Sequence, residues 1–423
     1  MGRARKSRIP RIGASPKFRV VPSRCTAEEG STTGIDITPR HRPRLARFGG
    51  ATGPEQWRDE SSAPPSASRL AIAHEWIAER AGSEKTFEAM ARVFPQADLF
   101  ALTAEPSGDF DFGGREVRTT VLDRSPWLRR RRDLTLPFMP LAWTLVRPPT
   151  RYDKVLTSSH ACVRAFPPAR TAEHFCYVHA PMRYAWDRTI DGRGGGRLTG
   201  AMLAVMRHWD RSSATTVDHF AANSTVVRER IHRFYRRDAC VISPPVDTDF
   251  FTPGDSGRPG SGALAVARFI PYKRLDLAID ACALAGTPLT IAGSGPQEAQ
   301  LRAKAERVRV PVKFEISPSD ERLRELYRAA EALVFAANED FGIVAVEAQA
   351  CGTPVVAVDQ GGARDTVVAG VTGLFAPRQD ARLLADALQA IGDSGIQAAD
   401  CRRNAERFGP ARFEAELRSW LSS

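Results

Sequence analysis

Short apolar runs alternate with segments of helical pattern throughout the second half of the chain. Strands that alternate with helices predict a parallel sheet with helices on both faces, because each parallel connection needs a crossover. The expected strands are Ala263–Arg268, Leu289–Ala292, Val312–Ile316, Ala332–Phe335 and Pro354–Val358. Helical patterns cover Ser319–Ala330 and Ile343–Cys351. We therefore predict a doubly wound α/β domain over residues 263–395.

The first half of the chain shows the same alternation from Arg69 onward. A strand at Leu70–His74 precedes a helix at Ser83–Phe94. Further strands are expected at Asp98–Leu102, Val117–Leu122, Lys154–Ser158, His174–His179, His219–Asn223 and Cys240–Ser243. This pattern predicts a first doubly wound domain over residues 69–245. Two Rossmann-like domains of this kind would face each other across a cleft, with ligands at the carboxyl ends of the strands.

Two connecting segments complete this organisation. A stretch rich in Pro, Gly and Ser follows the first domain, so we place the hinge between the domains at residues 246–262. The last segment, 396–423, contains a helix at Pro410–Leu421 with apolar residues at i, i+4 and i+8. Such a stripe must be buried against another element, and we expect it to pack back on the first domain.

The basic charge of the chain is concentrated at its start. Residues 1–68 hold 13 Lys and Arg against 6 Asp and Glu, whereas the whole chain has a net charge of +11. This segment is rich in Arg, Ser, Pro and Gly, and we predict a disordered basic extension. It could touch anionic lipid or nucleic acid. It could equally be a solvated extension or a start assigned too far upstream.

The remaining composition restricts the compartment and the chemistry. No run approaches the ~18 consecutive apolar residues of a membrane-spanning helix, and no secretory signal is recognisable at the N-terminus. The seven cysteines are scattered without a CxxC pair, so neither a disulfide framework nor a zinc site is expected. We predict a cytoplasmic protein without a bound metal.

The stretch from Asn338 to Pro354 carries the strongest functional signal. It lies between an expected strand and an expected helix that Gly342 opens, so free backbone N–H groups at the helix start would suit a phosphate. Glu339 and Glu347 could each accept hydrogen bonds from hydroxyl groups of a sugar and a ribose. Either glutamate alone would be equally typical of an ordinary helix surface.

This string, Glu339-Asp-Phe-Gly-Ile-Val followed by Glu347-Ala-x-Ala-Cys-Gly-x-Pro-Val, resembles the signature of family 4 glycosyltransferases. The resemblance implies the GT-B fold and a retaining, metal-independent transfer from a nucleotide-diphosphate sugar. It also implies that Glu339 contacts the donor sugar and that Glu347 holds the ribose. Backbone contacts to the sugar and phosphate would fall at Phe341, Gly342, Ile343 and Val344.

Two loops of the second domain add to the expected donor site. Arg268 and Lys273 flank a Pro turn and would neutralise a diphosphate, and they match the family's diphosphate-binding pair. The alternative is a solvated basic loop. Gly293 and Gly295 form a tight turn after a strand, with a supporting place near the nucleotide base. Asp365 stands where the family usually has Glu.

The first domain would contribute a further set of residues. Gly82 at a helix start would let the backbone approach the donor phosphate or the acceptor. His179 ends a strand and matches the family's histidine that contacts the donor sugar and phosphate. The string from His179 through Arg183, Tyr184 and Trp186 resembles a branch that includes O-antigen mannosyltransferases using GDP-mannose. The last three residues would line the acceptor or sugar pocket.

A basic run at Arg129–Arg132 lies between Trp127 and the apolar segment 134–146. This combination suits docking on an anionic membrane at the inner face of the cell membrane, where relatives use lipid-linked acceptors. An ordinary helix with a solvated charge run explains it equally well.

The pattern as a whole predicts transfer of a hexose, with GDP-mannose as the leading donor, onto a glycan or lipid-linked acceptor in cell-surface polysaccharide or glycolipid synthesis. Three alternatives remain at this point. They are a UDP-sugar-dependent enzyme of the same family, a basic nucleic-acid-binding protein, and a catalytically silent member that senses nucleotide sugars. No specific nucleic acid is expected as a partner, because most of the basic charge lies in the N-terminal segment.

Overall fold

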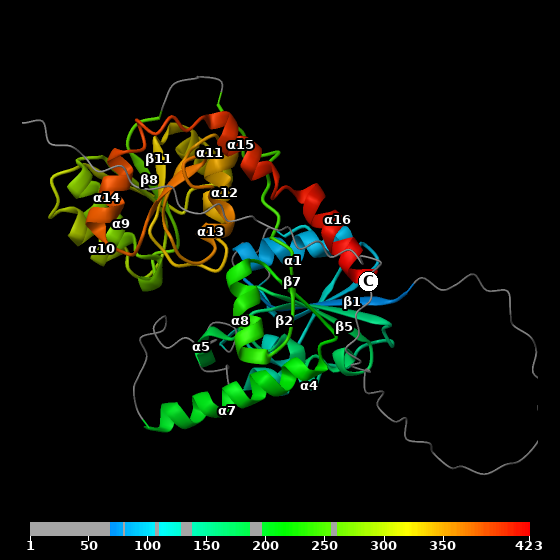
Figure 1. Cartoon of the computed structure of the whole chain (residues 1–423). Coiled ribbons are helices and arrows are strands. Elements are labelled where there is room, and N and C mark those ends of the chain that lie inside the picture. Colours follow the sequence, from blue (N-terminus) through cyan, green and yellow to red (C-terminus); the bar gives the residue numbers. More distant parts are fainter. Residues whose placement is uncertain (1–67, 79–80, 106–109, 128–137, 187–196, 255–259) are drawn as a thin grey trace, which may run out of the picture.

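The chain folds into two parallel-sheet domains, one after the other in sequence, joined again by the C-terminal helix (Figure 1). The computed structural model describes residues 68–78, 81–105, 110–127, 138–186, 197–254 and 260–423. The predicted disorder of residues 1–68 therefore lies, but for the last residue, outside the described residues. So does the basic run Arg129–Arg132.

The first domain contains a seven-stranded parallel sheet with the order β3-β2-β1-β4-β5-β6-β7. Its strands are β1 (Leu70–Ile77), β2 (Asp98–Ala104), β3 (Val117–Thr119), β4 (Lys154–Ser159), β5 (Glu173–Val178), β6 (His219–Ala222) and β7 (Cys240–Val241). The strand order reverses between β1 and β4, and a ligand crevice opens at such a reversal. All seven predicted strands are present, within a few residues of the expected bounds.

One of these predictions was too long. The strand expected at Val117–Leu122 ends at Thr119, and residues Val121–Arg124 form a 3-10 helix, η1. The reason is local, because the side chain of Thr120 accepts a hydrogen bond from the Leu122 N–H and caps the helical turn.

Helices cover both faces of this sheet. They are α1 (Gly82–Val93), α4 (Met139–Thr144), α5 (Arg183–Trp186), α7 (Arg197–Ser213) and α8 (Thr225–Tyr235), with short 3-10 turns η3 (Val163–Ala165), η4 (Pro167–Arg170) and η5 (Ala214–Thr216). Helix α8 begins at Ser224, whose hydroxyl accepts from the Val227 N–H. No helix among these or the other described elements is long and apolar enough to span a membrane.

The second domain contains a six-stranded parallel sheet with the order β10-β9-β8-β11-β12-β13. Its strands are β8 (Ala263–Val266), β9 (Leu289–Gly293), β10 (Val312–Ile316), β11 (Ala332–Phe335), β12 (Val355–Val358) and β13 (Gly373–Ala376). Its helices are η6 (Pro271–Lys273), α9 (Leu275–Ala285), α10 (Glu298–Ala305), α11 (Asp320–Ala329), α12 (Ile343–Ala350), α13 (Ala363–Thr366) and α14 (Ala381–Gln389). Strand β13 was not predicted, since it is short and begins with a glycine, which weakens any strand pattern.

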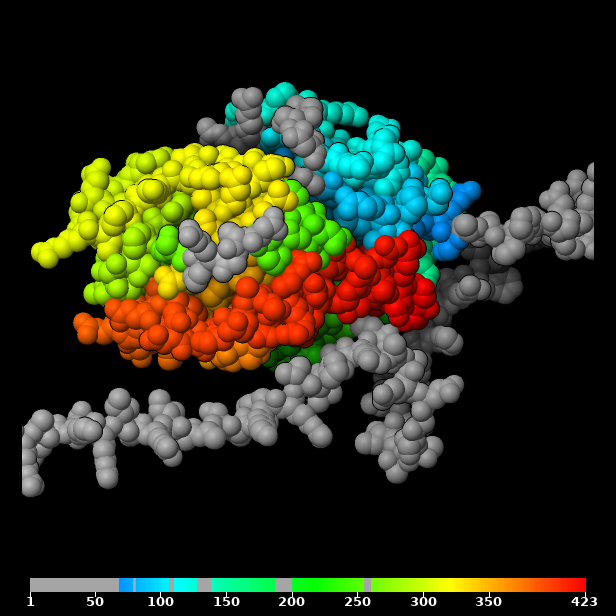
Figure 2. All heavy atoms as spheres, turned by 90° about the horizontal axis from the view of Figure 1, so that it is seen from above, coloured from blue at the N-terminus to red at the C-terminus, as the bar shows by residue number. Residues whose placement is uncertain are grey.

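The segment 396–423 divides between the two domains. Helix α15 (Ala398–Glu406) packs on α12, and the Arg402 guanidinium donates to the carbonyls of Thr248 and Phe251. Helix α16 (Pro410–Leu421) crosses to the first domain, where its apolar stripe joins the core (Figures 1 and 2). Four buried side chains form that stripe: Phe413, Leu417, Trp420 and Leu421. This helix therefore ties the end of the chain to the domain that begins it.

Candidate active site

The starts of α1 in the first domain and α12 in the second domain lie close together. A Cβ atom added to Gly82 would lie 2.7 Å from Cδ1 of Ile343. Gly342, the N-cap of α12, has a φ of 91°, and a Cβ there would lie 2.8 Å from the Phe335 ring. Glycine is therefore required at residue 342 for both reasons. Both helix starts carry free N–H groups, which makes the space beside them suitable for an anion.

The side chains on either side of Gly342 pack inward. Phe341 is buried and its ring lies 5.6 Å from that of Phe408. Val344 is half-buried and packs against the second domain's core. The side chains of Phe341 and Val344 are thus packed within the second domain, and the backbone contacts of residues 341–344 stay a prediction.

Lys273 and Glu339 form an ion pair, with Nζ 2.6 Å from Oε1 and both side chains only 14% exposed. The predicted diphosphate cation and the predicted sugar-binding carboxylate therefore lie next to each other. The short helix η6 delivers Lys273 from the loop after β8, while Glu339 comes from the loop after β11. Arg268 lies on the same β8 loop, is exposed, and reaches the Tyr272 hydroxyl at 3.5 Å.

Glu347 is buried and lies on α12, where the Tyr327 hydroxyl donates to its Oε2 at 2.8 Å. Burial raises the pKa of the Glu347 carboxyl, and nearby Lys85 opposes that rise. Lys85 belongs to α1 of the first domain and also approaches Asp320 of the second domain at 3.7 Å. Tyr327 was missed by sequence reasoning, because a tyrosine in the middle of an amphipathic helix reads as a packing residue.

Gly293 and Gly295 hold the β8 loop close to the β9 turn. Their φ angles are 137° and 150°, and a Cβ on Gly293 would lie 2.0 Å from the Ala267 carbonyl oxygen. A Cβ on Gly295 would lie 2.8 Å from the Phe269 nitrogen. These glycines therefore allow the close packing that places the loop bearing Arg268.

His179 stands at the carboxyl end of β5 and is firmly held. Its N–H donates to the Ser159 carbonyl, and its own carbonyl accepts from the Asn223 side chain. Its ring Nε2 lies 2.8 Å from the Ser158 hydroxyl. Burial lowers the pKa of His179 to about 3, so the imidazole is neutral at pH 7.

Arg183 of the first domain makes its ionic contact with the second domain. Its guanidinium pairs with Asp340 of the second domain and lies 5.4 Å from the centre of the Tyr272 ring. Arg230 of α8 pairs with the other oxygen of Asp340. Asp340 therefore connects the loop of Glu339 to two arginines of the first domain. Its position in the sequence motif did not predict this role.

Of the other two residues expected near the sugar pocket, only Trp186 has a described side chain. The side chain of Tyr184 lies outside the described part of the structure. Trp186 stacks on Phe234 at 4.4 Å, and its indole N–H donates to Asp210 at 2.7 Å. Phe234 and Asp210 both belong to the first domain.

Asp365 also joins the two domains. Its carboxylate accepts hydrogen bonds from the backbone N–H of Thr225, at 2.7 Å, and from the Thr225 hydroxyl. It thus caps the start of α8 from the other side of the cleft. The aspartate noted above as a departure from the family pattern has a defined structural partner in this chain.

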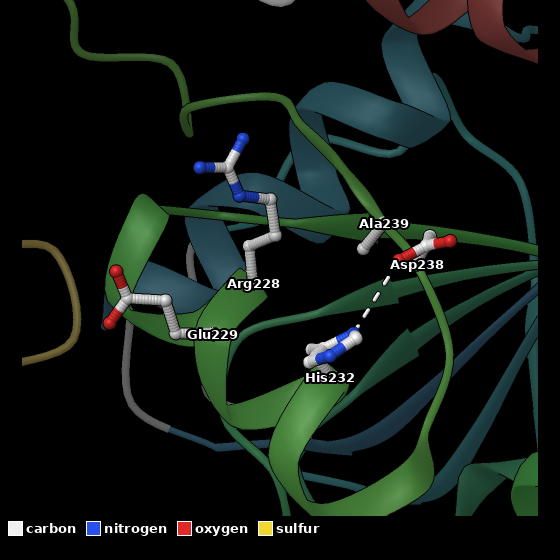
Figure 3. Close-up of a pocket in the computed structure, with 5 residues that line it drawn as sticks. All are labelled: Arg228, Glu229, His232, Asp238 and Ala239. Carbon is white, nitrogen blue, oxygen red and sulfur yellow. Dashed lines mark ion pairs between the residues drawn. The ribbon is translucent and has the colours of Figure 1, made fainter.

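A surface hollow on the flank of α8 is separate from these residues. It is lined by Arg228, Glu229, His232, Asp238 and Ala239, and His232 points toward Asp238 at 3.5 Å (Figure 3). Both members of this pair are largely exposed. None of the residues assigned to donor or acceptor lines it. Across the described residues no group of three His, Cys, Asp or Glu side chains could hold a metal ion, and metal independence stays a prediction.

Solved structures with this architecture identify the fold class. HepE from Anabaena, bound to UDP and glucose, matches with a TM-score of 0.63 at 18% identity over 84% of this chain and 100% of that chain. Sucrose-phosphate synthase from Thermosynechococcus elongatus matches with a TM-score of 0.66 at 19% identity, covering 83% and 98% of the two chains. The chain has the GT-B fold, and the predicted fold class is confirmed.

Sequence comparison adds a family match for the second domain. Residues 261–408 match the family described as glycosyl transferases group 1, and this range contains Lys273, Glu339 and Glu347. The D-inositol 3-phosphate glycosyltransferase of Geodermatophilus obscurus is 33% identical over 219 residues, 45% of this chain and 46% of that protein. The enzyme of the same name from Mycolicibacterium smegmatis is 35% identical over 198 residues, covering 42% and 45%. The chain spans about half the length of the curated relatives it matches.

Proposed function

We propose that this protein is a retaining glycosyltransferase that moves a hexose from a nucleotide-diphosphate sugar onto a glycan or lipid-linked acceptor. The observation that carries the proposal is the Lys273–Glu339 ion pair, next to the N-terminus of α12 and across the cleft from Gly82. Cations, free backbone N–H groups and a hydroxyl-binding carboxylate are the groups that such a donor requires.

Each group has a defined task in this proposal. Lys273 and Arg268 bind the diphosphate, together with the free N–H groups at the start of α12, and stabilise the negative charge that develops as the nucleoside diphosphate departs. Phosphate binding draws Lys273 from Glu339, whose carboxylate then accepts a hydrogen bond from a sugar hydroxyl. Glu347, oriented by Tyr327, accepts from the ribose. No bound metal is needed for this neutralisation.

Two donors fit the proposal, each for a separate reason. The string from His179 to Trp186 resembles the mannosyltransferase branch and favours GDP-mannose. The structural relative HepE was solved with UDP-glucose, and similarity to it favours a UDP-sugar. The nucleotide preference is therefore the first property to measure.

A melting-temperature screen of the full chain without added metal tests the proposal. The probes are GDP, GDP-mannose, UDP, UDP-glucose and UDP-N-acetylglucosamine. A ligand at 100 times its dissociation constant adds about 2.7 kcal/mol to the free energy of unfolding, a readily visible shift. A response to GDP and GDP-mannose supports GDP-mannose as the donor. A response to the uridine ligands supports a UDP-sugar donor instead. A folded sample that responds to none of them contradicts the donor site itself.

We also propose that the first domain docks on an anionic lipid surface to reach a lipid-linked acceptor. Phe138 and Leu141 are about 60% exposed on and beside α4, and Met202 and Val205 are exposed on α7. Both helices contribute to the same core cluster, and they lie on the same side of the first domain (Figure 1). The nearby sequence Arg129–Arg132 supplies the matching positive charge.

Sedimentation with phosphatidylglycerol vesicles tests this second proposal. We expect the full chain to bind them, and the double variant Phe138→Ser, Leu141→Ser to bind at least about 10-fold more weakly, because each buried apolar side chain contributes roughly 1.5–3 kcal/mol. Leu284→Ser, which changes an exposed leucine of α9 in the second domain, is the control. Equal vesicle binding by the double variant and the control would contradict the proposed docking surface.

A further inference from the structure

A hydrogen-bonded chain of three side chains lies in the first domain at the point where the strand order reverses. His74 of β1 and Ser158 of β4 are direct partners in the sheet register. The Ser158 hydroxyl lies 3.0 Å from Nδ1 of His74 and 2.8 Å from Nε2 of His179. His74 and Ser158 are fully buried, whereas His179, which follows the carboxyl end of β5, is partly exposed.

We propose that His74 and Ser158 are positioning residues that hold His179 in the tautomer with its hydrogen on Nδ1. In that form His179 presents a hydrogen-bond donor to an oxygen of the bound sugar phosphate. This inference rests on the proposed function for its ligand, but the tautomer itself is a property of the free protein.

The surroundings of Nε2 of His74 determine which nitrogen of that ring carries the hydrogen. Its Nε2 is buried and has no hydrogen-bond partner among the described residues. The ring stacks on Phe87 with centroids 5.0 Å apart and planes at 15°, so an in-plane N–H would not point at the aromatic face. A buried N–H without an acceptor is rarer and costlier than a buried lone pair without a donor. The hydrogen of neutral His74 therefore belongs on Nδ1.

The position of the hydrogen on His74 determines the direction of the hydrogen bond from Ser158. Since Nδ1–H of His74 donates to the Ser158 oxygen, the single hydroxyl hydrogen of Ser158 is free to donate elsewhere. In the described part of the chain, its side chain has only the two histidine nitrogens as hydrogen-bond partners. The hydroxyl must then donate to Nε2 of His179, or remain buried and unsatisfied.

The hydrogen bond from Ser158 determines the tautomer of His179. A neutral imidazole carries one hydrogen, and an Nε2 that accepts from Ser158 leaves that hydrogen on Nδ1. Burial lowers the pKa values of both His74 and His179 to about 3, which keeps both rings neutral at pH 7. Among the described residues Nδ1 of His179 has no partner, so it is available to a ligand. The ring would then orient the ligand by donation and would not take a proton from it.

Nitrogen NMR of the full chain, labelled with 15N in the histidine rings, tests the inference directly. The signals of His179 are assigned by their loss in His179→Ala. We expect the wild-type protein without ligand to show a protonated Nδ1 and an accepting Nε2. We expect His74→Phe, which lets the Ser158 hydroxyl accept instead of donate, to shift His179 toward the Nε2–H form. We expect His74→Asn, which keeps a side-chain donor to Ser158, to retain the wild-type form. A wild-type His179 protonated at Nε2 overturns the proposal.

A thermodynamic cycle separates this role from simple packing. Affinity is measured by calorimetry with UDP-N-acetylglucosamine and with GDP-mannose. One of the two nucleotide sugars is expected to bind. In the wild-type background we expect Ser158→Ala to weaken its binding by about 3- to 10-fold, which is the effect of losing one hydrogen bond. In the His179→Ala background the same change should have no further effect. An equal loss in both backgrounds would show a structural role and overturn the proposal. Failure of both ligands to bind, with the predicted tautomer present, would instead contradict the donor assignment alone.

Discussion

At the scale of single residues, the Lys273–Glu339 ion pair determines how charge is neutralised in the site before a ligand binds. Each group neutralises the other while both are mostly buried, so neither charge is left without a partner before a ligand arrives. A diphosphate would replace Glu339 as the partner of Lys273. This exchange links binding of the phosphate to release of the carboxylate that is proposed to bind the sugar.

The change Lys273→Ala should lower nucleotide affinity by about 10- to 100-fold, since a hydrogen bond to a charged group contributes roughly 1.5–3 kcal/mol. Calorimetry with UDP and GDP measures the loss. Lys313→Ala, an exposed lysine on β10, is the matched control and should bind normally. Wild-type affinity in a folded Lys273→Ala protein would refute the assigned role.

At the scale of elements, α8 depends on the opposite domain for the capping of its start. Ser224 satisfies the Val227 N–H from within the first domain, while Asp365 of the second domain satisfies the Thr225 N–H. A carboxylate beside the positive end of a helix is also favoured by the helix dipole. The cap therefore stabilises both the helix and the contact between the domains.

Asp365→Ala should lower the free energy of unfolding by about 1–2 kcal/mol, the usual loss for a removed cap. Asp359→Ala breaks a more exposed pair with Arg364 and should cost at most about 1 kcal/mol. Denaturant titration of both variants gives the comparison. Equal stabilities for the two variants would mean that Asp365 contributes no more than a surface charge.

At the scale of the whole molecule, Asp340 joins the domains beside the candidate active site. It is 9% exposed by its side chain and pairs with Arg183 and Arg230, which otherwise present two positive charges to the same small space. These contacts hold the two domains together in the arrangement of this structure. Helix α16 adds a second connection, because it follows the second domain in sequence and packs on the first-domain core.

Arg230→Ala should shift the protein toward a more open arrangement, measured as a larger radius of gyration in X-ray scattering of the free protein. Raised salt should weaken the wild-type contact less than the mutation does, because partly buried pairs are screened little. Arg233→Ala, on the same helix but exposed to solvent, serves as control. An unchanged radius of gyration in Arg230→Ala would show that the ionic contact does not hold the domains together.

Sequence alone determined the elements and the class of fold. The apolar runs from Leu70 to Val358 predicted strands because burial on both faces of a parallel sheet demands continuous apolar residues. Only β13 escaped this pattern, and Val121 and Leu122 were assigned to a strand although they open a 3-10 helix that Thr120 caps. The motif around Gly342 likewise pointed to the donor side of the site, since glycine and glutamate at that spacing act through local backbone geometry.

Tertiary structure alone decided which of these residues meet. Asp340 with Arg183, Asp365 with Thr225, and Ser158 between His74 and His179 are all separated by at least 21 residues in the chain. Partners such as these are chosen by strand order and by the packing of one domain on the other, and neither leaves a periodic trace in the sequence. The sequence determined which groups the site contains, whereas the fold decided which of them are charged, paired or free to bind, because those properties depend on neighbours that are remote along the chain.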